Sequence, residues 1–443
     1  MTNISARQCA FDILLKVIRD ASYSNLALDS TLNSSGLSAR DAAFATALVY
    51  GVIERKRTID YQLTLRLSKP LKKLKPQVYV IRMIGAYQIL YMDKIPVSAA
   101  VNESVKLAAA NGCSFAKGLI NAVLRRVADN GICLPESNSP EYTGIKYSCE
   151  DWICSLWKDS YGEDNAVGLL ESSFAADDVA LRVNTLKTSA EELSQMLASE
   201  GFEAVISDSV PNALIVKGGG ALHRSKCFEA GLFHVQDISS QLCCSVLGVE
   251  EGDTVFDMCA APGGKTLTLA QMMNNTGRIH CFDIYENRLG LISSAAERLG
   301  TGNVVTEVND GSVLNSSLPS ADKILCDVPC SGLGIIRKKP EIRYKKKAEV
   351  DKLPDLQYSI LCISAEYLKP GGSLVYSTCT LDPAENEDVV GRFLDGHDDF
   401  EPVRVLPGLT RPCGDTDYIS LMPHIHGCDG FFISKFKRNS RGV

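Results

Sequence analysis

Apolar residues in the first third of the chain recur with the period of an α-helix. The spacing i, i+3, i+4, i+7 is clear at Ala10, Ile13, Leu14 and Val17. It recurs over residues 119–127, and the segment 78–92 is apolar on nearly every side, as in a buried central helix. No convincing strand alternation interrupts these segments. The pattern predicts an all-helical domain of five or more helices, which we assign to residues 1–135.

A linker and a region of mixed character follow. The stretch 131–144 is rich in Gly, Pro, Ser and Asn and has no periodicity, which is typical of a linker. After it, DDVALRVNTL (177–186) alternates like a strand, and NALIVKG (212–218) is rich in β-forming residues. SAEELSQMLASEG (189–201) opens with the spacing of a capping box and ends on a glycine, as helices do. We therefore expect a small α+β connector domain over residues 145–235.

From residue 236 onward, short apolar strands alternate with helical segments. The expected strands are TVFDMCA, RIHCFDI, NVVTEV, KILCDV and SLVYST. Between two of them, apolar residues at helical spacing from Leu289 to Leu299 mark a helix that Gly300 stops. This rhythm predicts a doubly wound, mostly parallel sheet over residues 236–443.

The composition excludes several classes of protein. Apolar residues make up 45 % and charged residues 22 % of the 443 residues, close to globular averages, so a disordered or fibrous chain is excluded. No stretch reaches 18 consecutive apolar residues, and the amino terminus lacks the apolar run of a signal peptide. The 16 cysteines include no CxxC pair, which argues against a zinc ribbon and for reduced thiols. We expect a cytoplasmic protein with no metal and no membrane partner.

Charge is distributed unevenly along the chain. The net charge is −7, but residues 1–140 hold 18 Lys and Arg against 10 Asp and Glu, a net +8, and the remainder carries −15. A basic amino-terminal block indicates a polyanion-binding module joined to an acidic body. Lys72 and Lys73 lie in its most basic run and are candidates for contact with an RNA backbone, with a solvated helix face as the alternative.

The strongest local signal is the loop in VFDMCAAPGGKT, residues 255–266. A strand runs into small residues and then into a helix, so backbone N–H groups can approach a ligand closely. A P-loop needs glycine where Cys259 stands, and the GxGxxG spacing is absent, so a phosphate cradle and a dinucleotide site are both disfavoured. Asp283 closes the next expected strand and Asp310 follows the third, where a carboxylate either receives ribose hydroxyls or caps a helix. These positions favour a site for a nucleoside without polyphosphate.

Two cysteines follow neighbouring strands of the same expected sheet. CDVPCSGLG (326–334) places Asp327 and Cys330 at a strand-to-loop turn, and STCT (377–380) places Cys379 at the end of the next strand. Because active sites of open parallel sheets lie at the carboxyl ends of strands, we expect both thiols at the crevice of the glycine loop. Most other cysteines are expected to be small apolar core residues.

These motifs are similar, in the same order, to those of a known family. The chain resembles the bacterial small-subunit (16S) ribosomal RNA cytosine-C5 methyltransferases of the Sun (Fmu) type, within the NOL1/NOP2/Sun group. The similarity runs through RVNTLKTS, QDISSQL, DMCAAPGGKT, DVPCSGLG, LKPGGSLVYSTCTLDPAENE and DGFFISKFKR. The amino-terminal region resembles the NusB antitermination fold. The resemblance implies a Rossmann-like class I methyltransferase domain with a mostly parallel seven-stranded sheet, an all-α NusB-like domain, and a small α+β connector of RRM or ferredoxin-like type.

The resemblance also implies a chemistry and a role for each site residue. S-adenosylmethionine is the implied cofactor and S-adenosylhomocysteine the product. Cys379 is implied as the nucleophile that adds to C6 of cytosine, and Cys330 as the residue that assists product release. Asp327 would hold the base at N3 and N4, and Lys265 would orient Asp327. The implied cofactor contacts are Cys259, Ala260, Ala261, Pro262, Gly263, Gly264, Lys265, Asp283, Asp310 and Asp327.

The expected partner is 16S ribosomal RNA, free or in a partly assembled subunit, bound by a monomer. The basic residues beside the Cys330 loop are further candidates for RNA contact: Arg337, Lys338, Lys339 and Arg343. The target base must lie in a loop or be flipped out of a helix. Two alternatives stay open: a cytosine-C5 methyltransferase acting on tRNA, and an RNA-binding antitermination-type factor with a vestigial methyltransferase domain.

Overall fold

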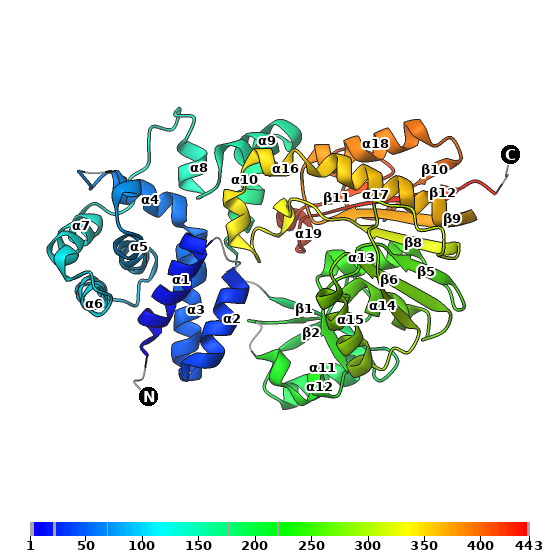
Figure 1. The fold of residues 1–443 in the computed structure, drawn as a ribbon, viewed down its shortest axis with the longest axis horizontal. Helices are drawn as coiled ribbons and strands as arrows, with labels where there is room; N and C mark the ends of the chain where they lie inside the picture. The colour runs from blue at the N-terminus through cyan, green and yellow to red at the C-terminus, as the bar shows by residue number, and fades with distance from the viewer. Residues whose placement is uncertain (1–3, 21–23, 69, 176–177, 219–220, 441–443) are drawn as a thin grey trace. The chain divides into compact units, whose positions relative to one another are not determined.

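The computed structural model describes residues 4–20, 24–68, 70–175, 178–218 and 221–440 of the chain (Figure 1). The chain divides into two compact units. The first comprises Met1–Leu156 and Lys339–Lys345, and the second comprises Trp157–Lys338 and Lys346–Val443.

In the described residues of the first unit, all regular secondary structure is helical. Its helices are α1 (Ala6–Asp20), α2 (Ser24–Ser35), α3 (Ala39–Glu54), α4 (Lys56–Thr64), α5 (Pro76–Tyr91), α6 (Val97–Ala110), α7 (Lys117–Asn130), α8 (Tyr142–Lys146) and the first part of α9 (Asp151–Tyr161). The apolar stripe of α1 is buried, and α5 is buried on most of its circumference, as the pattern predicts. Leu119 on α7 departs from the pattern because it is 49 % exposed, while Ile120 and Val123 beside it are buried.

The segment Lys339–Lys345 lies far along the sequence but is built into the first unit. Its residues Pro340–Tyr344 form a 3-10 turn. Tyr344 donates its hydroxyl to the carbonyl oxygen of Ile53 at 2.8 Å, and Trp152 donates Nε1 to the carbonyl oxygen of Lys345 at 2.9 Å. The first compact unit is therefore larger than the amino-terminal domain expected from the sequence.

The second unit begins with a small antiparallel sheet. After α10 (Glu163–Ser172), four strands pair in the order β2-β3-β1-β4. They are β1 (Val179–Val183), β2 (Ala204–Ile206), β3 (Ala213–Val216) and β4 (Phe233–Val235). Helices α11 (Ala190–Ser199) and α12 (Lys226–Glu229) accompany them, and Ser189 and Glu192 form the expected capping box on α11. The mixed region is thus an α+β module.

The larger sheet of the second unit contains the five strands expected from the sequence. Its main order is β10-β12-β9-β8-β5-β6-β7, and β11 pairs with β12 as an eighth strand. The strands are β5 (Thr254–Asp257), β6 (Arg278–Asp283), β7 (Val304–Val308), β8 (Ala321–Asp327), β9 (Leu368–Thr378), β10 (Phe400–Val403), β11 (Ile419–Leu421) and β12 (Phe431–Arg438). Pairing is parallel from β9 through β7 and antiparallel at β12. The mostly parallel sheet is confirmed.

Helices cover both faces of this sheet (Figure 1). They include α13 (Ile238–Leu247), α14 (Gly264–Met272), α15 (Glu286–Leu299), α17 (Leu353–Tyr367) and α18 (Glu387–Gly396). Two further short helices of the second unit are α16 (Lys347–Val350) and α19 (Pro423–His426). Successive residues of a strand point to opposite faces, so Val255 packs in one core with α13 and α14, and Phe256 packs in the other with α17. Strands buried on both faces explain why their sequences are short continuous apolar runs.

Among the described residues, the chain forms no helix that has both the length and the apolar character needed to cross a bilayer.

Candidate active site

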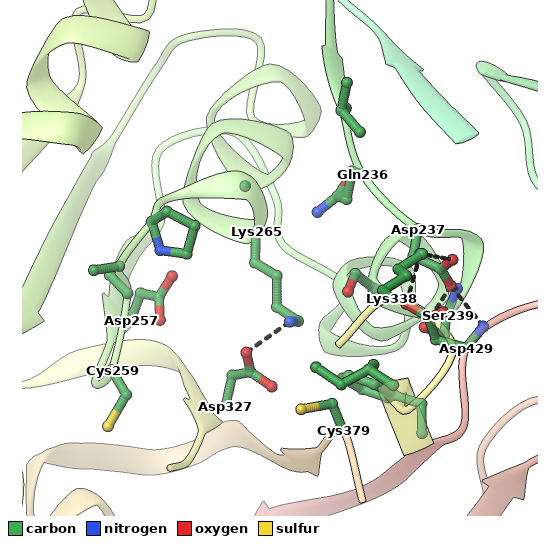
Figure 2. A pocket seen from close by; sticks show the side chains of 18 residues that line it. Gln236, Asp237, Ser239, Asp257, Cys259, Lys265, Asp327, Lys338, Cys379 and Asp429 are labelled. Carbon is green, nitrogen blue, oxygen red and sulfur yellow. Dashed lines mark hydrogen bonds and ion pairs between the residues drawn. The ribbon is translucent and has the colours of Figure 1, made fainter. Parts of the chain in front are cut away.

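A cavity of about 300 Å³ opens at the carboxyl ends of the central strands of the larger sheet (Figure 2). Lys265 from α14, Asp327 at the end of β8 and Cys379 just after β9 all line it. The three residues are far apart in sequence and meet because β5, β8 and β9 are neighbouring parallel strands. This is the edge at which open α/β sheets bind ligands.

The glycine loop between β5 and α14 forms one wall of the cavity. Ala260 donates its N–H to the carbonyl oxygen of Phe282 at 2.8 Å, which fixes the loop against β6. Gly263 has φ +104°, and a Cβ on it would lie 3.0 Å from the side chain of Ile292, so glycine is required there. The loop residues that line the cavity are Cys259, Ala260, Ala261, Pro262, Gly264 and Lys265. Small side chains leave the backbone open toward the cavity, as the sequence predicts.

Asp257 lies buried beneath this loop at the end of β5. Its Oδ2 accepts a hydrogen bond from Thr266 Oγ1 at 2.7 Å, and its Oδ1 has no hydrogen-bond partner among the described residues. Burial raises the pKa of Asp257 to about 7 despite the hydrogen bond from Thr266. Gln236 on the opposite wall also has a buried Nε2 atom without a described partner. These unpaired polar atoms suit a cavity that takes a polar ligand.

Lys265 and Asp327 form an ion pair inside the cavity. Lys265 Nζ lies 2.6 Å from Asp327 Oδ2, and Ser377 Oγ donates to Asp327 Oδ1 at 2.9 Å. Burial opposes the charge on Lys265, but the attraction of Asp327 outweighs it and raises the pKa of the ammonium group. Both carboxylate oxygens are held, so Asp327 has a fixed orientation. The contact expected between Lys265 and Asp327 is present.

Cys330 and Cys379 are close enough to share a proton. Their Sγ atoms lie 3.3 Å apart, and both side chains are half-buried. The hydrogen bond to Cys379 raises the pKa of Cys330 well above its ordinary value, and burial raises it further. Either thiol can donate the hydrogen bond between them, and negative charge is disfavoured on Cys330. Only Cys379 of the two lines the cavity itself, beside Asp327 (Figure 2).

Asp283 and Asp310 lie at the ends of β6 and β7, as expected, but outside the residues that line this cavity. Asp283 is buried, accepts from the N–H of Tyr285 at 2.9 Å and pairs with Arg288 at 2.9 Å. Arg288 also donates to the carbonyl oxygen of Ala261 at 3.0 Å, which ties Asp283 to the glycine loop. Asp310 is exposed, and its hydrogen bonds with Ser312 lower its pKa. In the structure Asp310 caps its own turn.

Sequence reasoning missed an ionic cluster on the far wall of the cavity. Lys338 Nζ lies 2.7 Å from Asp237 Oδ2 and 2.7 Å from Asp429 Oδ2 (Figure 2). Burial and the charge of Asp237 raise the pKa of Asp429 to about 7, against the attraction of Lys338. Asp237 and Asp429 belong to the QDISSQL and DGFFISKFKR motifs, which gave them no role. Their separation of almost two hundred residues left no spacing signal to pair them.

The RNA-contact prediction is wrong for Arg343. This residue is fully buried in the first unit and donates Nη1 to the carbonyl oxygen of Tyr147 at 3.2 Å. Arg337 and Lys338 are engaged with Asp429, so their charges are partly neutralised. Lys339 is exposed, and its contact with RNA stays a prediction. Lys72 and Lys73 are also exposed, on a 3-10 turn of the first unit, and stay predictions.

Two glycines meet at the back of the Cys379 turn. Gly334 donates its N–H to the carbonyl oxygen of Cys379 at 3.0 Å, and Gly430 donates to the carbonyl oxygen of Gly334 at 2.9 Å. A Cβ on Gly334 would overlap the carbonyl oxygen of Gly430. We expect Gly334→Ala to lower the free energy of unfolding by about 2 kcal/mol or more, measured by urea denaturation, because a backbone contact cannot rotate away.

Gly391→Ala is the control for this substitution. Gly391 lies on α18 with open space around its Cα, so alanine there is expected to leave stability unchanged or to raise it by up to about 1 kcal/mol. Equal unfolding midpoints for Gly334→Ala and the wild type would contradict the close contact.

Three family models match successive parts of the chain. The model for the NusB family matches residues 4–129, the ferredoxin-like domain of RsmF/B-like methyltransferases matches residues 150–223, and the 16S rRNA methyltransferase RsmB/F model matches residues 244–437.

Curated and solved relatives match nearly the whole chain. The probable ribosomal RNA small subunit methyltransferase B of Bacillus subtilis is 35 % identical over 99 % of this chain and 100 % of its own length. The probable enzyme of the same name from Synechocystis is 36 % identical over 98 % of this chain and 100 % of its own length. The crystal structure of the protein PH0851 superposes with a TM-score of 0.84 at 26 % identity, covering 97 % of this chain and 98 % of its own.

The fold and the cavity together define an S-adenosylmethionine-dependent methyltransferase with a Rossmann-like sheet and a NusB-like amino-terminal domain. The chain belongs to the RsmB/F family of small-subunit ribosomal RNA methyltransferases. It is therefore an RNA-methylating enzyme, and the expected family, fold and enzyme class are confirmed. Within the described residues, no group of three or more His, Cys, Asp or Glu side chains is arranged to hold a metal ion.

Proposed function

We propose that the protein methylates C5 of one cytosine in 16S ribosomal RNA through a covalent bond between Cys379 Sγ and C6 of the base. The observation that carries this proposal is the meeting of two pairs at one edge of the sheet. Lys265 and Asp327 are 2.6 Å apart, and Cys330 and Cys379 are 3.3 Å apart. An acidic group to bind the base and a thiolate to attack it are the two requirements of this chemistry.

The cavity fits the cofactor by its backbone and by its unpaired polar atoms. S-adenosylmethionine, when bound, supplies an electrophilic methyl group. The loop Cys259–Lys265 would hold it, and the small residue Gly264 supports this, because a Cβ there would lie 3.7 Å from Gln236 Nε2 on the opposite wall. Gln236 Nε2 and Asp257 Oδ1 lack described partners and would gain them from a polar ligand. Asp283 would receive the ribose hydroxyls, and Asp310 would lie near the adenine.

Covalent attack solves the poor nucleophilicity of C5. The Cys379 thiolate adds to C6, and the C5=C6 electron pair becomes available at C5 to displace the methyl group from the sulfonium sulfur of the cofactor, which would leave as S-adenosylhomocysteine. Asp327 holds N3 and N4 of the base and stabilises the proton that the adduct takes up from water at N3. Water then accepts the C5 proton, the C5–H electron pair re-forms the C5=C6 bond, and the Cys379–C6 bond breaks to return the thiolate as N3 gives back its proton. Cys330, which contacts the Cys379 sulfur, assists this release.

The direct test is methylation of unmodified ribosomal RNA by the purified protein. We expect bisulfite sequencing of 16S RNA incubated with S-adenosylmethionine to reveal one protected cytosine, with free RNA and partly assembled subunits compared as substrates. Protection in tRNA alone would favour a tRNA enzyme. Absence of cofactor binding by calorimetry would favour a vestigial domain. We also propose that the monomer is active, which sedimentation of the active fraction tests.

A Cys330→Ala variant is expected to trap the covalent intermediate. If Cys330 assists release, its loss lets Cys379 attack and methyl transfer proceed while the Cys379–C6 bond persists. A slowly migrating protein–RNA band should then appear on a denaturing gel in the presence of cofactor. The double variant Cys330→Ala/Cys379→Ala is the control and should give no band. A band of equal intensity in both variants would rule out Cys379 as the attacking atom.

A further inference from the structure

The segment that follows Cys379 is buried although it carries two polar side chains. Pro383–Glu385 form a 3-10 turn, and Glu385 and Asn386 are each 0 % exposed. Neither is among the residues that line the cavity. A buried carboxylate and a buried amide cost free energy unless they are hydrogen-bonded, so their partners indicate what they stabilise.

Glu385 holds the turn that carries Cys330. Its Oε2 accepts a hydrogen bond from the backbone N–H of Ser331 at 2.8 Å and another from Gln357 Nε2 at 2.8 Å. Gln357 Nε2 also donates to the carbonyl oxygen of Pro329 at 2.9 Å. The residues on both sides of Cys330 are thus tied to one buried carboxylate.

Asn386 holds the turn that carries Cys379 in a matching way. Its Oδ1 accepts from Thr378 Oγ1 at 2.6 Å, and its Nδ2 donates to the carbonyl oxygen of Thr380 at 3.1 Å. A hydrogen bond of 2.6 Å between Ser331 Oγ and Thr380 Oγ1 then joins the two turns directly. Asn386 therefore contacts the residues on both sides of Cys379, and Glu385 contacts the residue after Cys330 directly and the one before it through Gln357.

We propose that Glu385 and Asn386 are positioning residues that hold the thiols of Cys330 and Cys379 at hydrogen-bond distance, with the Glu385 carboxyl group bound to the residue that follows Cys330. This inference rests on the proposed function for the catalytic meaning of the two thiols. The 3.3 Å between the sulfur atoms is then a property of the clamp formed by Glu385 and Asn386.

The charges around the thiols have the sign that the proposal needs. Cys330 interacts with the titratable groups of Cys379, Glu385 and Asp327, and each disfavours a second negative charge there. Tyr376 interacts with Cys330 as well, and its own pKa is raised mainly by burial. Burial raises the pKa of Glu385, although its hydrogen bonds with Ser331 and Gln357 oppose this. The charge of Asp382 also raises the pKa of Glu385. The hydrogen bond between the two sulfur atoms can be donated by either thiol, and these charges disfavour the arrangement that places negative charge on Cys330.

Three variants distinguish the effect of the thiol positions from the effect of the Glu385 charge. In Glu385→Gln the amide oxygen can replace Oε2 and keep both hydrogen bonds, because Oε1 has no described partner, so mainly the charge is lost. Glu385→Ala removes the hydrogen bonds as well, and Asn386→Ala releases the Cys379 turn. Glu387→Gln is the matched control, because Glu387 is a largely buried carboxyl two residues along that contacts Ser420 and neither cysteine turn.

The measurement is the pH dependence of alkylation of each cysteine by iodoacetamide, followed by peptide mass spectrometry on the full-length protein. In Glu385→Gln we expect the Cys330 profile to move to lower pH, with alkylation at about pH 8 at least about threefold faster. Asn386→Ala should change the Cys379 profile and lower kcat about tenfold, with KM for RNA retained. Glu387→Gln should stay within about twofold of the wild type in both assays.

Alkylation profiles of Glu385→Gln and Asn386→Ala that superpose on the wild-type profile would contradict the positioning role of Glu385 and Asn386. If Glu385→Ala fails to fold, as thermal melting would reveal, the isosteric Glu385→Gln variant still tests how the charge of Glu385 affects the reactivity of Cys330. Alkylation needs neither RNA nor cofactor, so it tests the clamp even if the protein methylates another base. Conversely, full methyl transfer by a Cys379→Ala variant would overturn the proposed function and leave the alkylation result standing.

Discussion

Replacing Cys379 with alanine is expected to lower kcat for methyl transfer at least about a thousandfold, because the variant lacks the thiolate that attacks C6 in the proposed mechanism. Of the two neighbouring thiols, Cys379 is the one that lines the cavity, and its sulfur lies 3.3 Å from that of Cys330. Without the added thiolate, C5 of cytosine stays too weak a nucleophile to take up the methyl group. Transfer of tritiated methyl groups to unmodified 16S RNA measures the loss.

The same variant should bind the cofactor normally. The wall proposed to hold the cofactor is the glycine loop, whose contacts include hydrogen bonds with Phe282 and Arg288. Cys362→Ala is the matched control, since Cys362 is another half-buried cysteine, on α17, and does not line the cavity. Methyl transfer by Cys379→Ala at the rate of Cys362→Ala would contradict the covalent mechanism.

Much of the fold could be predicted because hydrophobic patterning reports burial directly. Each central strand of the larger sheet sends alternate residues into two separate cores, as Val255 and Phe256 do, so it must be apolar throughout. Helices such as α15 bury one stripe and stop at a glycine, here Gly300 in the left-handed conformation. Both patterns are local, and a sequence displays them without knowledge of the partners.

The site could be predicted in part because topology brings the strand ends together. Asp327 and Cys379 follow adjacent parallel strands, β8 and β9, so their meeting follows from the order of the sheet. The ionic cluster of Asp237, Lys338 and Asp429 could not be predicted, because its members come from three distant loops. Contacts of this kind depend on loop conformation, which apolar periodicity does not specify.

Arg343 shows where charge patterning misleads. It stands in a run of basic residues that is typical of a solvated, RNA-facing loop, yet its side chain is fully buried in the first unit. Burial lowers its pKa, although the charge of nearby Cys149 and other groups opposes this. A buried guanidinium needs carbonyl oxygens, and Tyr147 supplies one. The sequence carries no signal that the segment Lys339–Lys345 belongs with helices some two hundred residues earlier.

Replacing Asp327 with asparagine is expected to lower kcat about a hundredfold and to destabilise the protein by about 2 kcal/mol or more. Asparagine has nearly the same shape and can still accept the hydrogen bond from Ser377. It loses the charge that stabilises a protonated base, and it leaves the ammonium of Lys265 without its counter-charge. The Lys265 side chain is only 12 % exposed, so water cannot compensate for the missing carboxylate. Methyl-transfer kinetics and urea denaturation measure the two effects.

Removing the partner as well separates catalysis from stability. In the double variant Lys265→Met/Asp327→Asn the buried ammonium is gone, so we expect stability to recover toward the wild type while activity stays low. Asp322→Asn is the control: Asp322 lies at the other end of the same strand and also pairs with a lysine, Lys369, at 2.9 Å, but outside the cavity. Its loss should leave kcat within about twofold of the wild type. Recovery of activity together with stability in the double variant would mean that Asp327 serves only to neutralise Lys265, and its role in holding the base would be lost.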